Sequence, residues 1–236
     1  MGYESRALVS ANSHVRHLLR RHDAAHRRHP LERSWAGRLL HRNLREYEQA
    51  ERIYVASRYV RESFLAEGVP EERLAPFPLT PAPRFQPVGT PNDSSAFEVV
   101  YVGALSVIKG VPLLIEALAR LSQRDLRLVL VGGAGTRGMR RYLLAAASKD
   151  PRIQISPGDP LPHLRRARLC VHPAYEDGFA YAPAEALACG VPVVVSEDTG
   201  MKELIGPHAG LVVPSGDVDA LAEAIDAAYR GDPIDG

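Results

Sequence analysis

One lysine stands out among the residues of this chain that could do chemistry. The sequence has three Lys against 26 Arg, and Lys109 lies in the loop Gly103-Ala104-Leu105-Ser106-Val107-Ile108-Lys109-Gly110, between an apolar segment and a helical pattern. The start of a helix attracts anions through its free N–H groups and its dipole, so an added ammonium suits a diphosphate. A solvated surface charge is the alternative explanation of this lysine.

An acidic segment further along the chain is a second candidate. Glu176 and Asp177 precede an Ala-rich helical pattern that is too apolar to be exposed. Pro183 suits the first position of that helix, so we expect Glu185 in its first turn, beside the positive helix end. Carboxylates placed there can accept hydrogen bonds from sugar hydroxyls. An acid in a first helical turn is also an ordinary helix stabiliser, so that alternative stays open.

Two glycine-containing turns could bring backbone close to a ligand. Gly133 lies in the turn VGGAG at 131–135, and Gly158 lies in the turn PGDP at 157–160, which could offer backbone groups to a flat base. Neither turn is a G-x-G-x-x-G motif. Steric needs and simple turn chemistry explain both equally well.

The segments that must position these residues alternate between strand and helix. The runs EVVYV, LRLVLV and VVVS are almost continuously apolar, which is typical of strands covered on both faces. An α/β fold with a doubly wound parallel sheet follows, and its ligands bind beyond the carboxyl ends of the strands. We expect its strands at Phe97–Val102, Leu126–Val131, Ile153–Ile155, Leu169–His172, Val193–Ser196 and Leu211–Val213, and its helices near 111–121, 137–148, 183–189, 200–205 and 217–229.

A proline-rich segment divides the chain. We predict a partial, mostly helical N-terminal segment over 1–85, a linker over 86–96, and a nucleotide-binding domain over 97–236. Within the first segment the pattern predicts an amphipathic helix over 35–50, short strands at Ile53–Ala56 and Leu74–Phe77, and a short helix capped by Ser57.

Composition excludes several classes of protein. With 45% hydrophobic and 24% charged residues, the chain is that of an ordinary globular protein. Residues 1–45 carry a formal charge of +7 and six His, so they could contact phosphates, an anionic membrane or only solvent. Nucleic-acid binding is disfavoured because few aromatic residues accompany the Arg. Cys170 and Cys189 read as buried thiols. With no apolar run long enough to span a membrane and no signal peptide, we expect a cytoplasmic protein.

Two motifs resemble the family-4 retaining glycosyltransferases, which have the GT-B fold of two facing Rossmann-like domains. The stretch YVGALSVIKGVPLLIEAL looks like the family's strand, diphosphate loop and helix, and HPAYEDGFAYAPAEALACGVPVVVS looks like its E-x7-E segment. By resemblance, Lys109 binds the donor's diphosphate, Glu185 the ribose and Asp177 the transferred sugar, with Lys109 and Asp177 catalytic. The implied donor site consists of Gly103, Lys109, Gly133, Gly158, Glu176, Asp177, Gly178, Phe179, Ala180 and Glu185.

The chain departs from the family pattern at three places. Asp177 stands where the family usually has Glu, so either the donor sits closer or Glu176 takes part. Ala104 replaces a common phosphate-binding Arg. The first 85 residues have no room for the family's first several strands and glycine-rich acceptor loop. The resemblance therefore predicts sugar transfer from a nucleotide sugar to a glycan, lipid-linked or small acceptor, without metal or cofactor. The alternative is a truncated, non-catalytic nucleotide-sugar-binding module that needs a partner.

Overall fold

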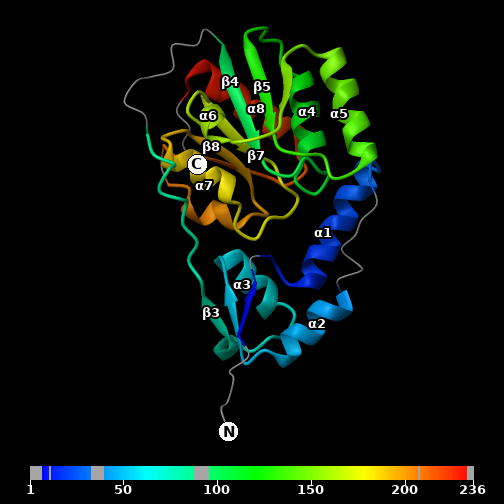
Figure 1. Cartoon of the computed structure of the whole chain (residues 1–236), viewed down its shortest axis with the longest axis vertical. Coiled ribbons are helices and arrows are strands. Elements are labelled where there is room, and N and C mark those ends of the chain that lie inside the picture. Colours follow the sequence, from blue (N-terminus) through cyan, green and yellow to red (C-terminus); the bar gives the residue numbers. More distant parts are fainter. Residues whose placement is uncertain (1–6, 11, 33–39, 88–95, 207, 233–236) are drawn as a thin grey trace.

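The molecule consists of two α/β parts of unequal size. A computed structural model describes residues 7–10, 12–32, 40–87, 96–206 and 208–232. Each part is built on a parallel sheet, one with six strands and one with three. Figure 1 shows the larger part above the smaller one, with helix α1 (Val15–Arg28) on one side and the chain that follows the third strand on the other. The α/β class and parallel sheet predicted from the sequence are confirmed.

The larger sheet has the strand order β6-β5-β4-β7-β8-β9. Counted from β4, this is the order 3-2-1-4-5-6 of a doubly wound nucleotide-binding sheet, in which the direction of winding reverses between the first and fourth strands. That switch point lies between β4 and β7. The strands match their predicted positions to within one residue: β4 (Phe97–Val102), β5 (Leu126–Val131), β6 (Ile153–Ser156), β7 (Leu169–His172), β8 (Val193–Ser196) and β9 (Gly210–Val213).

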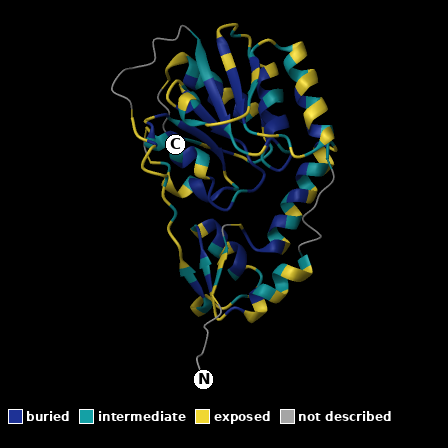
Figure 2. Cartoon of the chain, in the orientation of Figure 1, coloured by how far each residue is buried: buried dark blue, intermediate teal, exposed yellow. Residues whose placement is uncertain are grey.

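Helices cover both faces of this sheet because alternate strand residues are apolar on both sides. One apolar cluster joins the strands to α4 (Val111–Ala119), α5 (Arg137–Lys149) and α8 (Val218–Arg230). A second cluster joins the opposite face to α6 (Leu161–Leu164), α7 (Tyr181–Ala188) and the 3-10 helix η3 (Gly200–Leu204). The central strands are accordingly buried (Figure 2).

The smaller part has the strand order β1-β2-β3. Its core packs Ile53 of the central strand against Tyr47 and Phe64 of the neighbouring helices. The predicted helix over 35–50 appears as a helix from residue 40, and residues 35–39 lie outside the described residues. Sequence reasoning missed the first strand and α1. The elements are β1 (Ala7–Ser10), α2 (Leu40–Gln49), β2 (Arg52–Val55), α3 (Arg58–Leu65), η2 (Glu71–Arg73) and β3 (Leu74–Pro76).

Helix α1 joins the two parts, and several of its arginines pair with acids of this chain. The Arg20 guanidinium lies 2.8 Å from the Glu67 carboxylate, and Arg21 pairs with Asp198 of the larger part. Its buried residues, among them His22 and Ala25, pack inward. Helix α1 belongs to the basic N-terminal stretch. It therefore forms an internal contact between the two parts.

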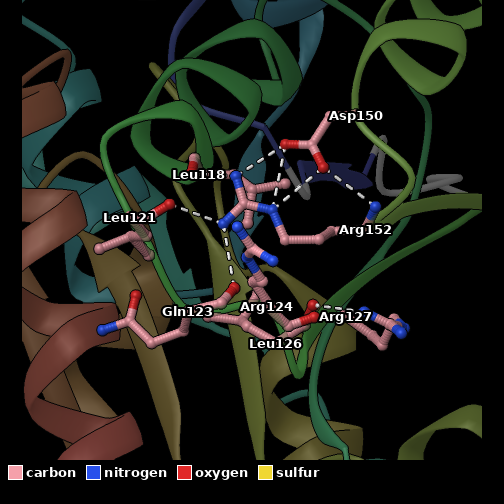
Figure 3. Close-up of polar contacts among 8 residues, drawn as sticks. All are labelled: Leu118, Leu121, Gln123, Arg124, Leu126, Arg127, Asp150 and Arg152. Carbon is pink, nitrogen blue, oxygen red and sulfur yellow. Dashed lines mark hydrogen bonds and ion pairs between the residues drawn. The ribbon is translucent and has the colours of Figure 1, made fainter.

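Arg152 binds backbone carbonyl groups at the C-terminus of α4 and just beyond it (Figure 3). Its guanidinium donates to the carbonyl oxygens of Leu118, Leu121 and Gln123 at 2.9, 2.7 and 3.2 Å. It also donates from Nε to both carboxylate oxygens of Asp150, at 3.0 and 3.1 Å. These hydrogen bonds hold the pKa of Asp150 below its ordinary value. Arg152 therefore ties the last turn of α4 and the segment that follows it to Asp150.

Replacing Arg152 with Met is expected to lower the free energy of unfolding by about 2 to 3 kcal/mol, because charged hydrogen bonds to carbonyl and carboxylate groups are lost. Urea unfolding at pH 7 measures this. The exposed neighbour Arg124 is the control, since Arg124→Met should change stability by less than about 0.5 kcal/mol. The difference between wild type and Arg152→Met should shrink as pH falls below about 4, the ordinary pKa of Asp in the unfolded chain, and through the lowered pKa of Asp150 in the folded state. A constant difference down to pH 2 would contradict this assignment.

Candidate functional site

The candidate site lies at the carboxyl edge of the larger sheet, where the loops after β4 and β7 meet. These strands flank the switch point, the usual place for a ligand in a doubly wound sheet. Gly110 has φ +72°, and a Cβ there would lie 1.9 Å from the carbonyl oxygen of Pro173 in the facing loop. The absence of a side chain at Gly110 thus lets the two loops pack directly, and brings Lys109 beside Asp177.

Lys109 and Asp177 form an ion pair at the centre of this edge. Lys109 Nζ lies 2.8 Å from Asp177 Oδ2 and donates to the carbonyl oxygen of Glu176 at 3.2 Å. His172 Nε2 lies 2.9 Å from the same Asp177 oxygen, and the Ala180 N–H donates to Oδ1 at 3.0 Å. Burial of Asp177 opposes ionisation, but the Lys109 charge and the His172 hydrogen bond outweigh it and hold the pKa of this carboxyl well below its ordinary value.

Helix α7 begins earlier than the sequence predicted. The prediction that Pro183 opens this helix was wrong, because the helix begins at Tyr181. Ala180 has φ +66°, and its N–H is bound to Asp177, so the chain turns sharply there and the helix starts at once. Pro183 is tolerated as the third residue because N–H groups of a first turn have no acceptor within the helix. Glu185 is consequently the fifth residue and lies beyond the first turn.

Glu185 is half-buried and faces the same cavity as the ion pair. Burial raises the pKa of its carboxyl, while the charge of Arg84 acts in the opposite direction. Arg84 itself is paired with Asp159 at 3.1 Å. The segment after β3 therefore passes close to this carboxylate.

One cavity of about 360 Å³ connects these groups. Six of the residues predicted for the donor site line it, together with Tyr181 and Ala182 of the first turn of α7. The six are Gly103, Lys109, Asp177, Phe179, Ala180 and Glu185. An ammonium and two carboxylates, far apart in the sequence, thus converge on one hollow above a parallel sheet.

The other four predicted residues lie around this cavity without lining it. Gly133 accepts the Leu105 N–H at 3.0 Å and so supports the Lys109 loop. Gly158 is exposed in its turn, with φ +124°. The carbonyl of Gly178 accepts a hydrogen bond from elsewhere in the chain, and the Glu176 side chain points away from the cavity into the contact with the smaller part.

The lining residues that sequence reasoning missed include Asn12, Tyr101 and His172. His172 is the last residue of β7, so its place at the carboxyl end of a strand beside the switch point was the available signal. Tyr101 is fully buried, and its hydroxyl donates to the Ala104 carbonyl at 2.8 Å. Asn12 comes from the smaller part, where no motif marks it.

The smaller part holds the loop that carries Asp177. Arg21 Nε donates to the Tyr175 carbonyl at 3.0 Å, and Ser57 Oγ donates to the Gly178 carbonyl at 2.5 Å. Between them the Ser13 N–H donates to Glu176 Oε1 at 3.4 Å. Residues on both sides of Asp177 are therefore tied to the N-terminal elements.

A carboxylate of the larger part in turn closes the start of α3. Glu203 accepts the N–H groups of Arg58 and Tyr59 at 2.9 and 2.6 Å. Free N–H groups at a helix start favour an anion, so this contact fixes the smaller part by its helix end. The docking of the two parts is polar and directional as well as apolar.

Within the described ranges, no group of three or more His, Cys, Asp or Glu side chains is placed to hold a metal ion. Cys170 and Cys189 are free thiols and are buried, as predicted, and burial raises the pKa of Cys170 to about 12. No helix in the described part of the chain is long and apolar enough to cross a membrane.

The buried carboxyl of Glu176 should make the stability of the fold depend on pH. It is 1% exposed, and burial raises the pKa of its carboxyl. The folded state therefore favours the protonated form, and stability is lost as pH rises through this raised pKa. Glu176→Gln removes that loss while an amide oxygen still accepts the Ser13 N–H. Thermal unfolding should show a stability gain for Glu176→Gln at pH 8 that vanishes near pH 4. A gain that is independent of pH, or a loss at pH 8, would contradict the burial argument.

Comparison with known proteins gives this architecture a family. The family model described as "Glycosyl transferases group 1" matches residues 96–230. A D-inositol 3-phosphate glycosyltransferase of Pseudarthrobacter chlorophenolicus is 32% identical over 148 residues, which are 58% of this chain and 35% of that protein. The chain spans about a third of the length of the first curated relatives that it matches.

Solved structures share the fold of both parts. WaaG, a glycosyltransferase involved in lipopolysaccharide biosynthesis, superposes with a TM-score of 0.76 at 18% identity, covering 95% of this chain and 66% of that one. Anabaena HepE, solved in complex with UDP-glucose, gives 0.71 at 22% identity, covering 80% and 58%. With the family model matching more than half of the residues, the doubly wound sheet and the loops at its switch point identify this chain as a member of the group 1 glycosyl transferase family.

Proposed function

We propose that this chain binds a nucleoside-diphosphate sugar at the switch-point cavity and transfers the sugar, with retention, to a glycan, lipid-linked or small-molecule acceptor. The observation that carries the proposal is the convergence of Lys109, Asp177 and Glu185 on one cavity. Membership of the family supports the reaction class. Two similar proteins, an inositol phosphate glycosyltransferase and a protein solved in complex with UDP-glucose, support a nucleotide-sugar donor.

Lys109 is proposed to hold the diphosphate. Its ammonium stands at the carboxyl edge of β4, facing the start of α7, whose first-turn residues line the same cavity. As the bond from the anomeric carbon to the diphosphate breaks, the electron pair passes to the phosphate oxygen. A fixed ammonium stabilises that charge more in the transition state than in the ground state. The acceptor hydroxyl then bonds to the anomeric carbon and gives its proton to the departing diphosphate oxygen.

The two carboxylates take separate roles in this proposal. Glu185 accepts hydrogen bonds from the ribose hydroxyls, and Asp177 accepts from the transferred sugar. Asp177 stands next to the ammonium and Glu185 lies on α7, so the sugar and the nucleoside lie on opposite sides of the diphosphate. Phe179 and Ala180 are proposed to contribute backbone donors. The Ala180 N–H keeps its hydrogen bond to Asp177 Oδ1 in this arrangement, so its contact with the donor is a second, shared one.

A second candidate function is nucleotide-sugar binding without transfer. The residues that converge on the cavity are those proposed for the donor, whereas sugar transfer also requires an acceptor held beside it. Equilibrium binding of UDP, GDP and ADP tests both candidates, and donor turnover with acceptors present separates them. Binding without turnover selects the second candidate, and no nucleotide binding contradicts both.

We further propose, from the family resemblance, that the protein acts in the cytoplasm without metal or organic cofactor. Turnover that survives EDTA supports metal independence, and turnover abolished by EDTA contradicts it. The proposal includes contact with an inner membrane surface. Co-sedimentation with vesicles at varied salt concentrations tests this contact. Because Arg20 and Arg21 are paired with acids of this chain, such contact must come from other basic residues.

Glu185→Ala is expected to weaken nucleotide affinity by about 1 to 3 kcal/mol, because the ribose hydroxyls lose a half-buried hydrogen-bond acceptor. Isothermal titration with the nucleotide that wild type binds measures this. Glu223→Ala, at an exposed position of α8, is the matched control and should leave affinity unchanged. Unchanged affinity in Glu185→Ala would reduce Glu185 to a structural residue of α7.

Asp177→Asn is expected to lower the transfer rate more than the nucleotide affinity. The amide keeps the shape of the side chain but loses the charge proposed to act on the sugar, and it leaves Lys109 free for phosphate. Initial rates and nucleotide affinity are measured on the same preparation. Glu185→Ala should show the reverse pattern, with a larger loss of nucleotide affinity than of transfer rate. An equal loss of rate and affinity would contradict the assignment of Asp177 to the sugar.

A further inference from the structure

His172 is a buried imidazole at the candidate site to which no role has been given. It ends β7, lines the cavity and is 4% exposed. Its ring lies parallel to that of Tyr101, with centroids 6.0 Å apart. Tyr101 is itself fixed by the hydrogen bond from its hydroxyl to the Ala104 carbonyl. The imidazole is therefore held in one orientation by its surroundings.

The hydrogen bonds of His172 define which ring nitrogen carries the proton. Nε2 lies 2.9 Å from Asp177 Oδ2, and a carboxylate accepts only from an N–H. Nδ1 is buried and has no hydrogen-bond partner among the described residues. The proton on Nε2 therefore points at Asp177, and this bond is the only one that His172 makes within the described chain.

Lys109 and His172 share one oxygen of Asp177 but differ in what a donor would do to them. Lys109 Nζ contacts Asp177 Oδ2 at 2.8 Å and is 23% exposed at its side chain, so an incoming diphosphate can reach it. Each phosphate oxygen that Lys109 binds competes with Asp177 for the same three ammonium protons. His172 has no such alternative partner, because its other nitrogen is buried and its ring is packed.

We propose that His172 is a positioning residue that holds the Asp177 carboxylate in place when the diphosphate of the donor engages Lys109. In that state the Nε2–H of His172 is the fixed donor to Oδ2, and the Ala180 N–H is the fixed donor to Oδ1. The carboxylate thereby stays aimed at the sugar. The consequence is that His172 contributes to the preference for nucleotide sugar over free nucleotide. This inference rests on the proposed function.

The test uses a matched pair of substitutions in the whole chain. Gln and Met are similar in length, and only Gln can present an N–H near the position of Nε2. Titration calorimetry measures the affinities of wild type, His172→Gln and His172→Met for UDP, GDP, ADP, UDP-glucose, GDP-mannose and ADP-glucose. Initial rates are measured with the donor that wild type turns over.

In His172→Met, the affinity for nucleotide sugar relative to nucleotide should fall about tenfold or more, and the transfer rate should fall with it. Affinity for the free nucleotide should stay within about twofold of wild type. His172→Gln should recover most of the sugar preference. Equal behaviour of the two variants, or a loss confined to free-nucleotide affinity, overturns the inference.

A wild-type measurement keeps the proposal testable if either variant fails to fold. Nitrogen-15 NMR of the His172 ring should show the proton on Nε2, retained when nucleotide is added. A proton on Nδ1, or loss of the Nε2–H signal on nucleotide binding, contradicts the inference. Failure of the proposed function is a different result: wild type then binds none of the six nucleotides, whatever the His172 ring shows.

Discussion

The ion pair between Lys109 and Asp177 is the contact on which the rest of the site depends. It joins the loops after β4 and β7, the two strands at which the winding of the sheet reverses. The direct packing of those loops at Gly110, the turn at Ala180 and the early start of α7 all serve this contact. A buried carboxylate is stable here only because a cation and further hydrogen-bond donors surround it. The ion pair thus joins the two charged groups that are proposed to act on a donor.

The site belongs to both parts of the molecule. Arg21, Ser13 and Ser57 reach from the smaller part to the residues on either side of Asp177, and Asn12 enters the cavity itself. The smaller part is therefore more than an acceptor-side fragment, because its residues hold the loop that bears a proposed catalytic carboxylate. A change in how α1 and α3 dock must alter the position of that loop. The proposed donor site and the docking of the two parts are in this way physically linked.

The larger sheet could be predicted from the sequence because its strands are short apolar runs whose pattern needs no tertiary information. The same holds for Lys109 and Asp177, which follow such strands in recognisable loops, whereas Glu185 lies on α7. The start of α7 could not be predicted, because the left-handed turn at Ala180 depends on a hydrogen bond to Asp177. Helix α1 was missed because its Arg and His residues read as a solvated arm. Its buried face includes His22, a residue type whose burial only a partner element explains. Which of the predicted glycines line the cavity likewise depended on how the loops pack.

The most direct test of the central claim is a crystal structure of this chain soaked with UDP-, GDP- and ADP-sugars. The account predicts one nucleotide in the switch-point cavity, with its diphosphate within hydrogen-bond distance of Lys109, its ribose against Glu185 and its sugar toward Asp177. A nucleotide bound elsewhere, or one in this cavity with its phosphates away from Lys109, would contradict it.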